Sequence, residues 1–140
     1  MKNGWLAAHN PSDREINDLL AAAERDLADC RAASLSPDWR AGIAYNAALQ
    51  SAAAALAAAG YRAGRDQHHM RVIQSLAHTI GTDADTIALL DRFRKKRNTA
   101  VYERAGLTSD KEAEEIRKLS QRLYSEVRQW LKKNHPKLMK

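Results

Sequence analysis

The stretch Ser36–Gly60, SPDWRAGIAYNAALQSAAAALAAAG, decides the fold of this chain. It begins with a serine that can cap a helix and a proline suited to the first helical position, and it ends with a glycine that can adopt a left-handed conformation. Because eleven of the twenty-three residues at 37–59 are alanine, the backbones of neighbouring helices can approach closely. The larger packing groups are Tyr45, Leu49 and Leu56. We therefore expect a central helix over residues 37–59.

Four further helices follow from caps and apolar periodicity. Ser12 and Ser109 each stand three residues before a glutamate, which is the capping-box pattern at a helix start. Gly81 and Gly106 mark two helix ends. The expected inner faces are Ile16, Leu20, Ala23, Leu27 and Cys30 in the first helix, Met70, Ile73, Leu76, Ala77 and Ile80 in the third, Ile87, Leu90, Phe93 and Val101 in the fourth, and Ile116, Leu119, Leu123, Val127 and Leu131 in the fifth.

These elements predict an all-α, single-domain antiparallel up-and-down bundle of about five helices. No segment shows sustained strand alternation, and the connections are short. The chain of 140 residues fits one domain, which we place at residues 12–134. Residues 1–11 are expected to form a flexible N-terminus, and residues 135–140 a basic tail.

Composition favours a soluble, cytoplasmic protein. The single cysteine, Cys30, cannot form an intramolecular disulfide and is expected to be core. The longest apolar run, residues 52–59, is far shorter than the ~20 residues that a membrane span requires. Residues 1–70 contain seven Lys/Arg and eight Asp/Glu, whereas residues 71–140 contain sixteen and nine. The basic half can attract RNA, DNA, a nucleotide or an acidic protein, or can form a solvated surface.

Motifs of common enzymes are absent from the sequence. It contains no glycine-rich phosphate loop, no paired-cysteine metal framework and no glycine-flanked serine nucleophile, so we expect no cofactor. His68 and His69 diverge by about 100° on a helix, and His78 is too distant along the axis to join them. We therefore expect no metal site.

The lead functional residue is Arg97, in the basic run Arg92–Tyr102, RFRKKRNTAVY. On an ideal helix Arg97 points within about 40° of Leu90 and Val101, so it interrupts an apolar stripe. A buried guanidinium requires a carboxylate, a subunit contact or an anionic ligand. Alternatively, its stem covers the core while its head reaches water at the helix end.

Neighbouring side chains extend this candidate site. Asn98 and Tyr102 are four residues apart and share a helix face, and Arg94 and Lys95 add positive charge. Two copies of Arg97 across a two-fold axis would repel unless an anion lay between them. A homodimer with a phosphate-binding cleft satisfies this condition.

The segment Arg97-Asn98-Thr99-Ala100-Val101-Tyr102 resembles the signature of higher eukaryotes and prokaryotes nucleotide-binding (HEPN) domains. Residues 40–61, with an alanine-tyrosine core, an alanine-rich stretch and a glycine stop, are similar to the second helix of that family. The similarity covers about residues 12–131. It implies a helical bundle that dimerises through the signature helices and binds RNA or a nucleotide. Many relatives are metal-independent endoribonucleases, or toxins paired with a small nucleotidyltransferase, so the resemblance also implies a toxin–antitoxin or defence role.

One position departs from the family motif. Tyr102 stands where the catalytic histidine is found, and a phenol with a pKa near 10 moves protons poorly at pH 7. A tyrosine can still stack on a base or donate a hydrogen bond to phosphate. We therefore expect RNA or nucleotide binding through Arg97, Asn98, Tyr102, Arg94 and Lys95, with weak or no nuclease activity. The alternatives are a metal-independent endoribonuclease toxin and a non-catalytic protein-interaction module.

Overall fold

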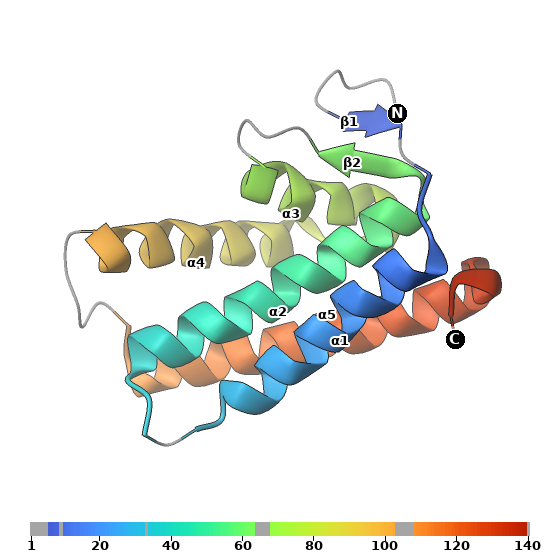
Figure 1. The fold of residues 1–140 in the computed structure, drawn as a ribbon. Helices are drawn as coiled ribbons and strands as arrows, with labels where there is room; N and C mark the ends of the chain where they lie inside the picture. Colours follow the sequence, from blue (N-terminus) through green and yellow to red (C-terminus); the bar gives the residue numbers. More distant parts are fainter. Residues whose placement is uncertain (1–5, 9, 33, 64–67, 103–107, 140) are drawn as a thin grey trace.

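The structure is a computed structural model that describes residues 6–8, 10–32, 34–63, 68–102 and 108–139. The prediction of an all-α, single-domain bundle of about five helices is confirmed (Figure 1). The described elements are β1 (Leu6–Ala8), α1 (Asp13–Asp29), α2 (Pro37–Ala58), β2 (Tyr61–Ala63), α3 (His68–Thr79), α4 (Ala84–Tyr102), α5 (Asp110–Asn134) and a 3₁₀ turn, η1 (Pro136–Leu138).

The alanine-rich helix α2 is central, as predicted. It packs against all four other helices, most extensively against α5 and α1, and Figure 1 shows it between α4 and the α1–α5 pair. Two core clusters form around it. One joins α2 to α3, α4 and the first half of α5, and the other joins it to α1 and the second half of α5. Every helix is therefore held in place through α2.

The predicted helix starts are confirmed where serine caps were expected. Ser12 and Ser36 accept backbone hydrogen bonds from Glu15 and Trp39, respectively. Ser109 and Glu112 form the complete capping box of α5. Gly81, with a φ of 73°, follows α3 in the left-handed conformation that glycine favours. Local capping chemistry thus accounts for most helix boundaries.

The predicted inner faces of α1 and α5 are confirmed, because all ten of these residues are buried. The expected face of α3 was partly wrong. Ala77 is exposed and Met70 is half-buried, whereas Val72 and Ser75 are buried. The short helix α3 lies against both α2 and α4, so its buried sector is broader than one stripe. The Ser75 hydroxyl donates to the Val72 carbonyl oxygen at 2.6 Å, which permits its burial.

The described fold reaches beyond the predicted domain of residues 12–134 at both ends. β1 pairs antiparallel with β2, with Leu6 opposite Ala63 and Ala8 opposite Tyr61. The sequence predicted no strand, because three-residue segments are too short to show alternation. At the other end, Asn17 Nδ2 donates to the Leu138 carbonyl oxygen at 3.0 Å, so η1, which lies in the predicted basic tail, docks on α1. No described helix has the length and apolar character needed to cross a membrane.

Candidate functional site

The predicted binding residues all lie in the second half of α4. The helical backbone continues through Tyr102, so Arg97, Asn98 and Tyr102 share one helix with Arg94 and Lys95. The side chains of residues 97–102 lie outside the part of the chain that the structure describes. The orientation expected for Arg97 thus stays a prediction, while the environment of Arg94 and Lys95 is defined.

Arg94 and Lys95 both reach one carboxylate, that of Asp91. Arg94 Nε lies 2.8 Å from Asp91 Oδ1, and Lys95 Nζ lies 3.2 Å from Oδ2. Burial alone would raise the pKa of Asp91, but the hydrogen bonds from Arg94 and Lys95 outweigh it and leave the pKa below its usual value. By residue type alone, Asp91, Arg94 and Lys95 carry a net formal charge of +1 (2 − 1). The side chain of Lys95 is 70% exposed, which places that charge at the surface.

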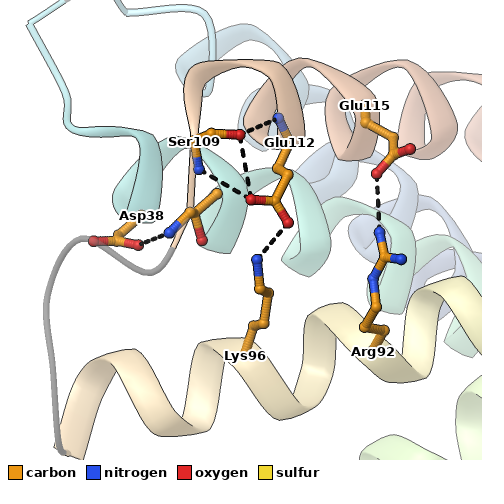
Figure 2. Close-up of polar contacts among 7 residues, drawn as sticks. Asp38, Arg92, Lys96, Ser109, Glu112 and Glu115 are labelled. Carbon is orange, nitrogen blue, oxygen red and sulfur yellow. Dashed lines mark hydrogen bonds and ion pairs between the residues drawn. The ribbon is translucent and has the colours of Figure 1, made fainter.

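Arg92 and Lys96 instead turn towards α5, as Figure 2 shows. Arg92 Nη2 lies 3.1 Å from Glu115 Oε1, and Lys96 Nζ is paired with Glu112 Oε2. The Arg92 guanidinium also lies over the Phe93 ring, 5.5 Å from its centroid. These two cations of the basic run are therefore balanced within the protein, so the surplus charge of α4 comes from other members of the run.

Lys96 pairs with Glu112, which forms the capping box of α5 together with the N-cap residue Ser109. Glu112 Oε1 accepts a hydrogen bond from the Ser109 backbone at 3.2 Å, and Ser109 Oγ accepts one from the Glu112 backbone at 3.1 Å (Figure 2). The hydrogen bond from Lys96, followed by those from Ser109, lowers the pKa of Glu112. The Thr108 backbone donates to Asp38 Oδ1 at 3.1 Å. One junction thus links α4, the start of α5 and the start of α2.

Removing the charge of Glu112 should make stability less dependent on pH. Glutamine can keep the capping box but not the ion pair with Lys96, so Glu112→Gln should cost up to about 1 kcal/mol at pH 7. Because the pKa of Glu112 is lowered on folding, the ionised form stabilises the protein above its unfolded pKa of about 4.3. That contribution is lost as the pH falls through the folded-state pKa.

Thermal melts of the original protein and the variant should therefore converge once the pH falls below the folded-state pKa of Glu112. Glu126→Gln is the matched control, because it changes a half-exposed glutamate that pairs with Arg122 further along α5, outside the capping box. We expect a smaller change for this control. Equal melting temperatures for the Glu112 variant and the original protein at pH 7 would contradict the role given to the Lys96 pair.

The sequence leaves open whether Tyr45 and Asn46, both on α2, line the site or only pack against α4. Tyr45 is 1% exposed and belongs to the core cluster around α2, α3 and α4, whereas Asn46 is half-buried. The Tyr45 ring lies 6.3 Å from the His69 ring, centroid to centroid. The structure thus makes Tyr45 a packing residue of the core.

The histidines do not assemble a metal site in the described part of the chain. His68 and His69 have ring centroids 6.1 Å apart, and His68 Nδ1 lies 3.3 Å from the Ala63 carbonyl oxygen. Among the described residues no group of three His, Cys, Asp or Glu side chains is placed to hold a metal ion. These contacts connect the start of α3 to β2 and to α2.

The structure contains a second polar site that the sequence did not predict. A hollow of about 400 Å³ lies between the end of α1, the start of α2 and the first turns of α5. Its lining residues are Cys30, Arg31, Arg40, Ala113, Glu114 and Arg117. The spacing of Glu114 and Arg117 predicts an ion pair on one helix face. Nothing local predicts that Arg31 and Arg40 join them, because their proximity depends on how α1 and α5 pack against α2.

The sequence matches none of the known family models and none of the curated proteins with which it was compared. The resemblance to HEPN domains is therefore a hypothesis that rests on the motif residues and on the similarity of residues 40–61.

Proposed function

We propose that this protein is a HEPN-like, homodimeric module that binds RNA or a nucleotide through the second half of α4. The binding residues are Arg97, Asn98, Tyr102, Arg94 and Lys95. The supporting observation is the arrangement at Asp91, where two cations share one carboxylate directly before the motif. The helix continues from this turn through Tyr102, so the motif begins beside a surplus of positive charge.

The chemistry of these side chains suits phosphate recognition without efficient cleavage. A guanidinium can donate two parallel hydrogen bonds to phosphate oxygens, and lysine adds a point charge. The Tyr102 phenol can stack on a base or donate to phosphate, but it is a poor proton carrier at pH 7. We therefore propose weak or no nuclease activity. The resemblance adds a toxin–antitoxin or defence role with a nucleotidyltransferase-like partner, which co-purification from native cells would test.

Replacing Arg97 by alanine should weaken RNA binding about tenfold or more. A hydrogen bond to a charged group contributes roughly 1.5–3 kcal/mol, and 1.4 kcal/mol corresponds to a factor of ten in affinity. Fluorescence anisotropy with a labelled single-stranded RNA at low salt measures the effect. The affinity of the original protein should also fall as salt is raised, because binding releases counterions from the phosphates.

Arg14→Ala is the matched control for this measurement. Arg14 is exposed at the start of α1, where it lies 3.9 Å from Asp18, and its loss changes net charge by the same amount. Equal RNA affinity in the Arg97 and Arg14 variants would exclude the proposed site. Light scattering measures the molar mass, and a monomer at the concentrations that bind RNA would exclude the dimeric cleft.

A further inference from the structure

The hollow at the end of the bundle gathers three arginines from separate parts of the fold. Arg31 follows α1, Arg40 lies in the first turn of α2, and Arg117 lies in the second turn of α5. Figure 1 shows the end of α1, the start of α2 and the start of α5 at the same end of the molecule. Glu114 is the one carboxylate of the lining, so the walls carry net positive charge.

Arg31 is the arginine most available to a ligand. Its side chain is exposed and forms no ion pair or side-chain hydrogen bond with any residue in the described ranges. It also lines an adjacent hollow of about 450 Å³ between α1 and α5, together with Tyr124 and Arg128. Arg31 therefore supplies a guanidinium without an ion pair at the edge of the arginine hollow. There the hydrogen bond from Arg117 and, to a smaller extent, the charge of Arg31 lower the pKa of Glu114.

Arg40 and Arg117 keep donors after forming their ion pairs. Arg40 is paired with Asp110 through Nη2, but its Nε is buried and has no hydrogen-bond partner among the residues described. Arg117 uses Nε and Nη2 on Glu114, with Nε at 2.9 Å from Oε2. A guanidinium has five N–H donors, so neither arginine is saturated. The N–H groups that their ion pairs leave over are donors for an anion in the hollow.

Apart from Glu114, whose carboxylate is paired with Arg117, the remaining lining carries no negative charge. Ala113 is apolar, and the Cys30 thiol is 2% exposed and donates to the Leu27 carbonyl oxygen at 3.2 Å. Burial raises the pKa of Cys30, against the opposing effect of Arg117 and Arg31, so the thiol is neutral at pH 7. Asp110 offsets part of the charge of Arg40, but its own side chain is 84% exposed and screened by water.

We infer that this hollow binds a phosphate group. Its three arginines come from three separate parts of the chain, and a phosphate presents three or four acceptor oxygens around one centre, whereas a carboxylate presents two. The volume of about 400 Å³ admits a phosphate together with part of the molecule that carries it. Either a free nucleotide or the end of an RNA strand can supply this group. The inference does not depend on the proposed function, because no residue of α4 lines the hollow.

Titration with inorganic pyrophosphate tests the site directly. In two-dimensional NMR spectra, resonances of Arg31, Arg40 and Arg117 should shift, and Arg31→Ala should weaken the affinity about tenfold. The variant should fold normally, since Arg31 is exposed. Arg14→Ala, at the other end of α1, should bind like the original protein. Absence of shifts around the hollow, or equal losses in the two variants, would overturn the inference.

RNA oligonucleotides with and without a 5′-phosphate identify the source of the group. If RNA supplies it, the phosphorylated strand should bind about tenfold more tightly, and Arg31→Ala should abolish that preference. If a free nucleotide supplies it, Arg31→Ala should weaken pyrophosphate and AMP binding while RNA affinity is unchanged. Arg97→Ala should weaken RNA binding at the α4 site but leave pyrophosphate binding intact. This result would show that the hollow and the α4 site are separate. No effect of Arg31→Ala on any of these ligands would refute the phosphate site.

Discussion

Replacing Phe93 by alanine is expected to lower the free energy of unfolding by about 3–5 kcal/mol. Phe93 is 2% exposed and belongs to the core cluster that joins α4 to α2 and α3. On the described part of α4, Leu90 is also buried, and Ile87 and Leu89 are partly buried against the same cluster. Truncation therefore removes much of the apolar area that holds α4 and leaves a cavity beneath the helix.

Urea denaturation followed by circular dichroism measures this loss. Phe93→Leu is the conservative partner, because it keeps an apolar side chain in the same place and should lose much less stability. The Arg92–Glu115 ion pair cannot replace the aromatic ring, since both side chains are about half exposed and such pairs contribute about 1 kcal/mol or less. A loss below about 1 kcal/mol for Phe93→Ala would show that α4 is held by something other than this core.

The same experiment bears on the proposed binding site. α4 packs on α2 and α3 and carries Arg94 and Lys95 beyond Phe93. If packing around Phe93 positions the second half of the helix, Phe93→Ala should also weaken RNA binding, whereas Phe93→Leu should preserve it. A helix that is locally loosened should lose amide hydrogen-exchange protection in α4 before the other helices.

Most of the fold was predictable because its signals are local. The serine caps of α1, α2 and α5 act within three residues of each helix start, and the predicted stripes of α1 and α5 follow from a single period. The β1–β2 pairing was not predictable, since two three-residue segments about fifty positions apart carry no period. The prediction of the buried residues of α3 was partly wrong for a related reason. Contacts with two different helices, α2 and α4, determine which side chains of α3 are buried.

In the candidate site, too, contacts within one helix were predictable from the sequence, whereas contacts between helices were not. The pairing of Arg94 and Lys95 with Asp91 follows from spacings of three and four residues on one helix. The partners of Arg92 and Lys96 on α5 depend on how two helices pack, which no local pattern specifies. The arginine hollow requires three elements to converge, so its members appear in the sequence as unrelated surface charges.

Enlarging one alanine of α2 tests why that helix is central. Ala54 is completely buried, in the cluster that α2 forms with α1 and α5, together with Ala47, Ala55 and Ala58. These small side chains let the backbones approach, so a leucine at position 54 has no space without moving a neighbouring helix. Overpacking of this kind costs about 1–3 kcal/mol, and the tightest sites lie at the upper end.

Ala21→Leu provides the matched control, because Ala21 is exposed on α1 and the substitution adds the same atoms. Leucine and alanine both favour helices, so the control should stay within about 0.5 kcal/mol of the original protein. The difference between the two variants in urea denaturation then isolates the packing cost from helix propensity. If Ala54→Leu were as stable as Ala21→Leu, α2 would have room to spare, and its alanines could not be the reason that four helices pack around it.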